Sequence, residues 1–459
     1  MTMPLEIWGV KDPNISAQLA LAAQRDLFQQ EAGLDVACRF IESGTTMAAD
    51  ILSAAQKPFA FTQTPITAML LREQGCGVKI VAPLADIAGA QQLVLRNADG
   101  IIHPRDLERK RIGMAKRSAI YVAIEKMARD YGVDLQKIEF VDLLPHDQLT
   151  AFLKGELDAM ACWEPWTSKA KSKGGTVYFS GVRSEIPGME GNVSWLVNQS
   201  CLIAPEEHLQ AHADELVAIL GALRKATEML NHDRKEVSKD LADFFGISRV
   251  ELLTVLNENA YSLRMDNLFR IGVLEFRDFL HKTGQISSRF AEQMLYDSSL
   301  LRELDPSLVA LEETAAQSLS IIQKGGIYYP SEMKLSGNNL RLRFLLADDS
   351  RYVRKMLTQA VRVIGGEILG EATSGSEAVE MFTRLRPNVV TMDLSMPGVS
   401  GLDAIKRILE LDPEVNIIVV SGADLEEVRN EVFELGVKIF ITKPFDPALV
   451  AEIVGLLLF

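Results

Sequence analysis

The amino-acid sequence predicts an α/β protein that contains at least two separate α/β units. The chain has 459 residues, which is more than one hydrophobic core usually serves, and 47% of them are apolar. Short apolar runs of strand length alternate with helical patterns over residues 5–83 and again over residues 342–457. In the second stretch the alternation of strands and helices predicts a parallel, doubly wound sheet.

Polar side chains end the predicted strands of this C-terminal unit. They are Asp348, Asp349, Asp393, Ser421 and Lys443. Because ligands of doubly wound sheets bind outside the carboxyl ends of the strands, we expect these five side chains to share one rim of the sheet.

The chemistry of that rim is predicted from its charges. Three carboxylates repel one another and need a partner cation, and oxygen ligands suit Mg²⁺. A carboxylate also acts as a nucleophile toward a phosphoryl group when a metal and a cation neutralise the phosphoryl oxygens. Asp393, Asp349 and Lys443 would supply these parts. Taken singly, an Asp-Asp pair is more often a helix cap and Lys-Pro a turn; their order on successive strand ends favours the functional interpretation.

With these residues in place, the last 120 or so residues resemble the receiver domain of two-component response regulators. The resemblance implies a flavodoxin-like (βα)5 fold over residues 341–459 and makes Asp393 the phosphoacceptor. It implies that Asp349 and Asp393 hold Mg²⁺ together with the backbone carbonyl of Ser395, while Asp348 acts largely through water.

The same resemblance assigns three further roles. Ser421 would reach a phosphoryl oxygen, and Lys443 would pair with the phosphoryl charge. Phe440 would be the aromatic switch whose inward or outward rotamer reports phosphorylation, although an aromatic in a strand is as often a core residue.

Composition excludes several other classes of function. The net charge of −14 and the isoelectric point near 5.1 leave no basic stripe, so we expect no nucleic-acid binding. The four cysteines are widely spaced and predict no metal site. Neither a secretion signal nor an apolar run long enough to cross a membrane is apparent, so we expect no membrane association and a cytoplasmic location.

The N-terminal alternation continues past residue 83 into a second lobe that starts near residue 88. In that lobe Lys116 to Ala119 open a helix directly after a strand, an arrangement that suits an anionic or polar ligand group or is a plain helix cap. Trp163 and Trp166 would line a pocket or lie in the core.

Residues 3–290 are similar to solute-binding proteins of the nitrate, sulfonate and taurine type, which include proteins that bind pyrimidine precursors of thiamine. The marks are Gly44-Thr45-Thr46, residues 61–65, residues 105–113, the Gly-Glu-Leu-Asp-Ala stretch and the Trp-Glu-Pro-Trp turn. The resemblance implies a two-lobed, periplasmic-binding-protein-like (type II) fold over residues 1–290, with lobe one from about 1–87 and 200–290 and lobe two from 88–199. It also implies a small polar or anionic ligand contacted by Trp8, Thr62, Gln63, Ser118, Ala119, Glu164 and Asn192.

The sequence departs from this family in two respects. Secreted relatives deliver their ligand to a membrane transporter, and this sequence shows no signal for that route, so we expect its lobes to sense. The enzyme branch that makes the thiamine pyrimidine relies on a cysteine-rich motif and iron, and the four cysteines here form no such cluster.

Residues 291–340 are predicted to be a helical connector and linker. Apolar residues recur at helical spacing over residues 288–323, Pro306 interrupts them, and Lys324-Gly325-Gly326 is predicted to end the helix before a loop from Ile327 to Asn339. The apolar stripe would pack on the lobes or pair two chains in a homodimer.

The sequence therefore predicts a cytoplasmic response regulator that is not an enzyme in its own right. It would accept a phosphoryl group from a histidine kinase or phosphotransfer protein, bind Mg²⁺ and a small molecule, and signal by protein contact. The alternatives are a receiver-regulated metabolic enzyme acting on a small molecule between the lobes, and a structural fusion with empty lobes.

Overall fold

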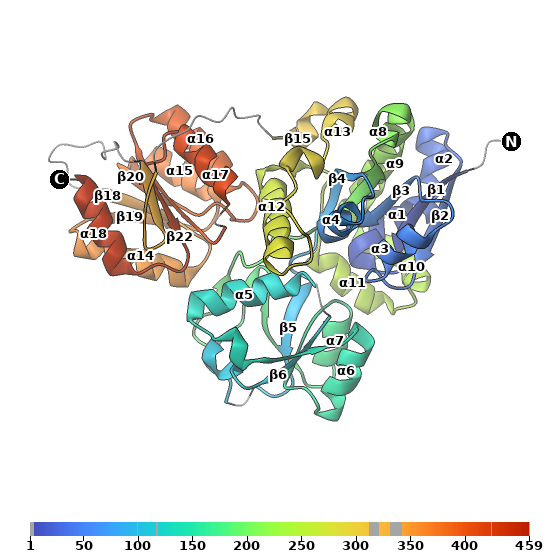
Figure 1. Ribbon diagram of the computed structural model, residues 1–459, viewed down its shortest axis with the longest axis horizontal. Coiled ribbons are helices and arrows are strands. Elements are labelled where there is room, and N and C mark those ends of the chain that lie inside the picture. The colour runs from blue at the N-terminus through green and yellow to red at the C-terminus, as the bar shows by residue number, and fades with distance from the viewer. Residues whose placement is uncertain are drawn as a thin grey trace.

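The computed structural model describes residues 4–98, 100–115, 118–311, 321–330, 342–423 and 425–458. Three large sheets organise these residues: one in lobe one, one in lobe two and one in the C-terminal receiver (Figure 1). A fourth, two-stranded sheet pairs β14 Met265–Asp266 with β15 Val309–Ala310. Lys116, Arg117 and residues 331–341 lie outside the described residues, so the predicted helix start at Lys116 and most of the predicted loop have no structural counterpart to compare.

Lobe one is a six-stranded sheet in the order β13-β4-β12-β3-β1-β2, with β1 parallel to β2 and β3, and β12 antiparallel to β3 and β4. Its strands are β1 Leu5–Val10, β2 Val36–Ile41, β3 Ala60–Gln63, β4 Val78–Asp86, β12 Gln199–Pro205 and β13 Ala260–Tyr261. Its helices are α1 Pro13–Gln24, α2 Leu27–Ala32, α3 Met47–Ser53, α4 Pro65–Glu73, α8 His208–Ala211, α9 Ala213–His232, α10 Arg234–Phe245, α11 Arg249–Glu258 and α12 Asn267–Lys282.

Lobe two is a seven-stranded sheet in the order β11-β10-β9-β5-β8-β6-β7. Its strands are β5 Gln91–Leu95, β6 Arg111–Met114, β7 Glu139–Asp142, β8 Ala159–Trp163, β9 Thr176–Ser180, β10 Arg183–Ser184 and β11 Gly191–Asn192. Its helices are α5 Ile120–Tyr131, α6 Pro145–Lys154 and α7 Trp166–Lys171. The chain passes between the lobes twice, at residues 87–90 and at residues 193–198.

The receiver sheet has the strand order β16-β17-β22-β21-β20-β18-β19, in which β19, β18, β20, β21 and β22 are parallel neighbours. These strands are β18 Arg343–Ala347, β19 Glu367–Ala372, β20 Val389–Met392, β21 Asn416–Ser421 and β22 Ile439–Thr442. The helices between and after them are α14 Arg351–Val363, α15 Gly375–Leu385, α16 Gly401–Leu411, α17 Glu426–Glu434 and α18 Pro447–Leu458.

Serine side chains cap the N-termini of three receiver helices. The hydroxyls of Ser350, Ser374 and Ser400 each accept a hydrogen bond from a backbone N–H in the first turn of α14, α15 and α16. Such caps satisfy donors that a helix otherwise leaves free. Because α14 and α16 begin beside the ends of β18 and β20, their caps help to fix the residues at the rim.

The helical connector predicted over residues 288–323 is wrong for most of its described length. The described helical turns there are short: Glu292–Met294, α13 Ser299–Leu304 and Pro306–Leu308. The chain then forms a hairpin of β16 Ile321–Lys324 and β17 Ile327–Pro330, in which Gly325 and Gly326 have positive φ. These glycines are therefore a hairpin turn, not a helix end. β17 pairs antiparallel with β22, so the hairpin extends the receiver sheet.

Helix α12 lies at the edge of lobe one that faces the receiver, next to lobe two (Figure 1). It belongs to lobe one, and its Arg277 forms an ion pair with Glu427 of α17 at 2.9 Å. Arg270 pairs with Glu431 of the same receiver helix. Toward lobe two, Glu275 accepts from Lys126 of α5 at 2.6 Å. Since Lys126 and Glu275 are both nearly buried, this pair is shielded from solvent, and α12 contacts both other parts of the molecule.

A tight backbone approach at Gly401 holds α16 against the rim. A methyl group built on Gly401 would lie 1.8 Å from the backbone oxygen of Asp393. We therefore expect Gly401→Ala to destabilise the protein by roughly 1–3 kcal/mol, because the backbone must move to relieve the overlap. Gly221→Ala in α9 is the matched control, since its added carbon would be 3.8 Å from Leu304 and alanine favours a helix. Urea unfolding of both variants tests this expectation, which fails if Gly401→Ala is as stable as Gly221→Ala.

Candidate functional site

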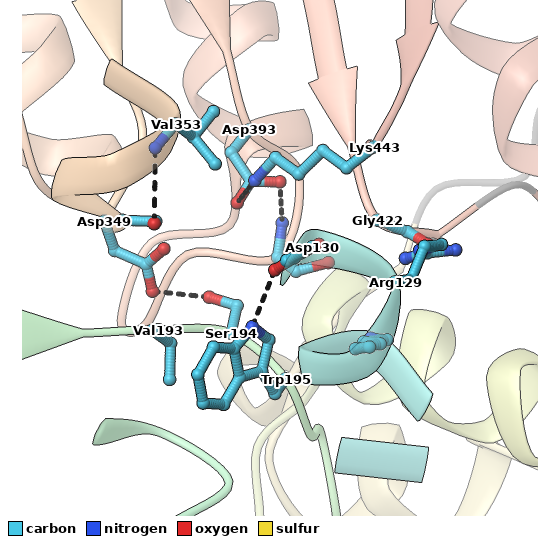
Figure 2. Close-up of a pocket in the computed structure, with 13 residues that line it drawn as sticks. Arg129, Asp130, Val193, Ser194, Trp195, Asp349, Val353, Asp393, Gly422 and Lys443 are labelled. Atoms are coloured by element: carbon cyan, nitrogen blue, oxygen red, sulfur yellow. Dashed lines mark hydrogen bonds and ion pairs between the residues drawn. The ribbon is translucent and has the colours of Figure 1, made fainter. Parts of the chain in front are cut away.

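Three buried aspartates meet at the carboxyl ends of two neighbouring receiver strands. Figure 2 shows two of them, Asp349 and Asp393. Asp348 and Asp349 follow β18, and Asp393 follows β20, which pairs with β18 in parallel. One carboxylate oxygen from each lies within 4.8 Å of the others. The structure therefore places these three residues together, as the strand-end pattern predicts.

Lys443 and Ser421 reach the same rim from the next two strands. The ammonium of Lys443 lies 2.7 Å from Asp348 Oδ2 and 2.8 Å from Asp393 Oδ2. Ser421 is fully buried at the end of β21, where its hydroxyl accepts a hydrogen bond from the backbone N–H of Ala423 at 3.1 Å. A single ammonium thus bridges two of the three carboxylates.

Burial and like charge dominate the electrostatics of this cluster. Burial, with the charges of its two acidic neighbours, raises the pKa of Asp348 well above its ordinary value despite the opposing effect of Lys443. Burial and the nearby Asp393 raise the pKa of Asp349 to about 6. Burial alone would lower the pKa of Lys443, but the three carboxylates outweigh it and raise that pKa. Lys443 therefore does not fully offset the burial and mutual repulsion of Asp348 and Asp349.

This donor set fits a hard divalent cation. Three carboxylates converge, and Asp349 Oδ1 is buried without a hydrogen-bond partner among the described residues. Oxygen ligands with room for water suit Mg²⁺, which would be held by Asp349 and Asp393 with Asp348 nearby. The backbone N–H of Ser395 donates to Asp393 Oδ1 at 3.3 Å. The role of the Ser395 carbonyl as a metal ligand stays a prediction.

Phe440 lies inside the receiver. It is fully buried in β22 and pairs across the strands with Tyr328 of β17, with ring centroids 6.3 Å apart. Arg429 of α17 lies over the Tyr328 ring at 4.2 Å. The predicted switch aromatic is therefore inward here and is covered by the hairpin, and its rotamer change stays a prediction.

Residues of lobe two cover the rim, which sequence reasoning did not predict. Figure 2 shows Ser194 pointing at Asp349, and its hydroxyl donates to Asp349 Oδ2 at 2.5 Å. The indole N–H of Trp195 donates to Asp130 of α5 at 2.8 Å. The cavity that remains between lobe two and the receiver is about 20 Å³. No sequence motif marks Ser194 or Asp130, because their position beside the receiver depends on how the domains pack.

A second, much larger cavity of about 410 Å³ lies between the lobes. Of the predicted ligand residues, Gln63, Ser118 and Ala119 line it. Other polar residues on its wall are Asp12, Asn14, Thr45, Thr64, Thr67, Glu73, Gln74, Gln91, Asn198 and Gln285, together with the ring of Trp163. The volume is that of a small-molecule site.

Trp8 and Thr62 are corrections to the predicted ligand set. The ring of Trp8 is buried, and the guanidinium of Arg39 lies 4.5 Å from its centroid. The hydroxyl of Thr62 is buried and contacts that of Ser16 at 2.7 Å. Both residues are on strands beside the cleft, but their side chains are committed to the interior of lobe one and do not line the cavity.

Glu164 and Asn192 are also wrong as cavity residues. Glu164 is fully buried, pairs with Lys171 at 2.7 Å and accepts from the Ser168 N–H at 2.9 Å, so it fixes the start of α7. Asn192 is exposed at the end of β11 and lies in a small pocket between lobe two and the receiver, near Tyr352. Trp166 is absent from the cleft wall, where Trp163 is the tryptophan present.

Asn198 and Ser118 carry the clearest sign of a ligand in the cleft. Asn198 Oδ1 and Ser118 Oγ have no hydrogen-bond partner among the described residues, and both residues line the cavity. Unpaired buried polar atoms are costly, so a bound molecule or water would satisfy them. Sequence reasoning identified Ser118 through its helix start but missed Asn198, which lies in the crossing segment 193–198.

Two family models match the chain. Residues 344–454 match the response regulator receiver domain, and residues 14–236 match the family described as NMT1/THI5 like. The chemotaxis protein CheY of Thermotoga maritima is 44% identical over 110 residues, which are 24% of this chain and 92% of that protein. CheY of Bacillus subtilis is 34% identical over 113 residues, 25% of this chain and 94% of that protein.

Solved structures resemble the two-lobed part. The periplasmic aliphatic sulphonate-binding protein SsuA of Escherichia coli aligns with 69% of this chain and 96% of its own at 14% identity, with a TM-score of 0.55. The nitrate-binding protein NrtA of Synechocystis aligns with 66% and 89% at 12% identity, with a TM-score of 0.53. At such identities the likeness concerns the fold. The predicted fold class, a type II binding-protein fold plus a flavodoxin-like receiver, is confirmed.

In the part of the chain that the structure describes, no helix has the length and apolar character needed to span a bilayer.

The acidic cluster predicts a measurable response to Mg²⁺. Binding should raise the melting temperature of the wild type, because a cation that binds only the folded rim stabilises it by mass action. Asp349→Asn should lose this shift while keeping the fold, since it removes a carboxylate at nearly constant volume. Glu410→Gln, an exposed change on α16, is the control and should keep the shift. Differential scanning calorimetry with and without Mg²⁺ makes the comparison, and an undiminished shift in Asp349→Asn would contradict the assignment.

Proposed function

The chain belongs, through its C-terminal receiver domain, to the response regulators, and on that premise we propose that it accepts a phosphoryl group on Asp393. We propose further that its two lobes bind a small molecule and that the protein works in the cytoplasm as a signalling protein and not as an enzyme acting between the lobes.

The ion pairs of Lys443 are the main support for the proposal that Asp393 accepts a phosphoryl group. Its ammonium contacts Asp393 and Asp348 at 2.8 and 2.7 Å, which places a fixed positive charge beside the proposed nucleophile. One oxygen of Asp393 would form a bond to phosphorus while the bond from phosphorus to the donor atom breaks, and the donor keeps that electron pair. Lys443 would then pair with the charge of the new phosphoryl group.

Other rim residues would assist the same transfer. The Ser421 hydroxyl accepts from the backbone N–H of Ala423 in this structure and would rotate to donate to a phosphoryl oxygen. Mg²⁺, when bound, would supply charge neutralisation for the phosphoryl oxygens. Asp349 and Asp393 would hold the ion, and Asp348 would contribute through water. The donor would be a phosphorylated histidine of a kinase or phosphotransfer protein, and the output would be a protein contact.

The cleft supports a polar ligand with hydrogen-bond donors. Among the described lining residues the charged side chains are those of Asp12 and Glu73, both acidic. Asn198 Oδ1 is an acceptor without a partner there, and Ser118 adds a hydroxyl. These groups favour a neutral or cationic molecule that donates hydrogen bonds, with an apolar part against Trp163, over the anion that the resemblance first suggests.

The phosphoacceptor is tested by labelling. With Mg²⁺ and a small phosphodonor, the wild type should gain one hydroxylamine-labile phosphoryl group, and Asp393→Asn should gain none, because an amide is not a nucleophile toward phosphorus. Asp446→Asn, which changes an exposed aspartate of the same domain, should be labelled as the wild type is. Intact-mass spectrometry measures the added phosphate. Label that persists in Asp393→Asn would refute the assignment of the acceptor.

The ligand site is tested by thermal stabilisation. A panel of amines, amides, nitrogen heterocycles, sulfonates and oxyanions should yield a compound that raises the melting temperature, at about 2.7 kcal/mol of stabilisation when its concentration is 100 times Kd. Ser118→Ala should weaken that compound by roughly 0.5–1.5 kcal/mol, the usual value of one hydrogen bond. Ser172→Ala, in the same lobe and absent from the cavity wall, should not. Stabilisation by anions alone would contradict the proposed ligand class.

A further inference from the structure

We propose that residues 193–195 and helix α5 of lobe two form a docking surface for the unphosphorylated rim of the receiver, so that docking and phosphorylation of Asp393 exclude one another. This inference rests on the proposed function of Asp393. It assigns the partner of the docking surface as the receiver of the same chain.

The contact reaches the reactive groups directly. The hydroxyl of Ser194 donates to Asp349 Oδ2 at 2.5 Å, so it uses an oxygen of a carboxylate that would otherwise be free for a metal. Trp195, which follows it, donates to Asp130 of α5 at 2.8 Å and is itself buried. The short segment is therefore held against lobe two on one side and bound to the acidic cluster on the other (Figure 2).

Helix α5 completes the contact around the rim. The guanidinium of Arg129 donates to the backbone oxygen of Gly422 at 2.8 Å, directly after Ser421. The next residue but one, Tyr131, contacts Tyr352 of α14 with ring centroids 5.2 Å apart. Lobe two thus touches the receiver beside the ends of both β18 and β21, on either side of Asp393.

The volume of the cavity between lobe two and the receiver limits which groups the docked rim can hold. The cavity of about 20 Å³ at the docked rim is partly open to solvent and has room for roughly one water molecule. A phosphoryl group adds a phosphorus and three oxygens, and a donor histidine must approach in line with Asp393. Neither fits while Ser194 and Arg129 remain in place.

Charge at this contact does not separate the two states. Lobe two places the carboxylate of Asp130 on the wall of this cavity, together with Lys126 and Arg129. Lys126 is paired with Glu275, whereas Arg129 keeps its positive charge because its partner is a neutral backbone oxygen. The space taken by Ser194 and Arg129 is therefore what distinguishes the free aspartate from the phosphorylated one.

The same segment also reaches the ligand cleft. Residues 193–198 are one of the two crossings between the lobes: Ser194 contacts the receiver, and Asn198 lines the cavity between the lobes. A change in the lobes that moves Asn198 would move a segment that ends at the phosphorylation rim. Docking is thus the physical element through which ligand and phosphoryl group would influence each other.

The test is made on the full chain with Ser194→Asp, which places a fourth carboxylate against the acidic cluster and should release lobe two. We expect Asp393 in this variant to be labelled by a small phosphodonor with Mg²⁺ roughly 5- to 150-fold faster than in the wild type, the range of ordinary coupling. Ser172→Asp, the same change on the exposed end of α7 in the same lobe, should leave the rate unchanged. Ser194→Ala, which only removes the hydrogen bond, should give a smaller increase in the same direction.

Hydrogen exchange supplies a readout that is independent of rate. Amides of residues 126–131 and 193–198 should lose protection when the wild type is phosphorylated, and should already have lost it in unphosphorylated Ser194→Asp. Equal labelling rates in the wild type and both Ser194 variants, or protection that phosphorylation does not change, would overturn the inference. Failure to label any variant, including Ser194→Asp, would instead refute the proposed function of Asp393.

Discussion

Three buried carboxylates, two of which pair with one ammonium, set the main constraint on this molecule. Burial and mutual repulsion raise the pKa of Asp348 and of Asp349, although Lys443 lies beside Asp348 and Asp393. The fold meets this constraint with partners from outside the receiver, since a hydroxyl from lobe two binds Asp349. A metal ion bound to these carboxylates, or the hydrogen bond from the docked lobe, would lower the cost of ionising them.

Helix α12 explains why lobe two lies at the rim at all. Its arginines pair with Glu427 and Glu431 of α17, which attaches the receiver to lobe one, and its Glu275 pairs with Lys126 of α5. The two attachments place α5 and the rim side by side. The pairs Arg270–Glu431 and Lys126–Glu275 are largely buried, so removing one partner would leave an uncompensated charge. These pairs therefore help to fix the relative position of the three parts.

Sequence reasoning succeeded where chemistry follows from local pattern and failed where it follows from packing. The rim was predictable because parallel strands all end at the same edge of a sheet, independently of how the sheet packs against other domains. The β16–β17 hairpin was not, because apolar residues at helical spacing precede a Gly-Gly pair that also suits a helix end. Trp8 and Thr62 were misassigned because strand position places a residue near the cleft without deciding what its side chain packs against. Ser194 had no signal, since its partner is 155 residues away.

The crossing segment 193–198 is the element through which the binding fold and the receiver would influence each other. A ligand shifts an equilibrium only by the difference in its affinity for the two states. In the proposed mechanism the two states would be lobe two docked and lobe two undocked. The segment at the contact carries Ser194 near one end and Asn198 at the other. A ligand that favours one position of Asn198 would therefore bias access to Asp393, and a phosphoryl group on Asp393 would bias the cleft by the same factor. Neither effect needs a long pathway through the core, because one strand-to-strand crossing reaches both sites.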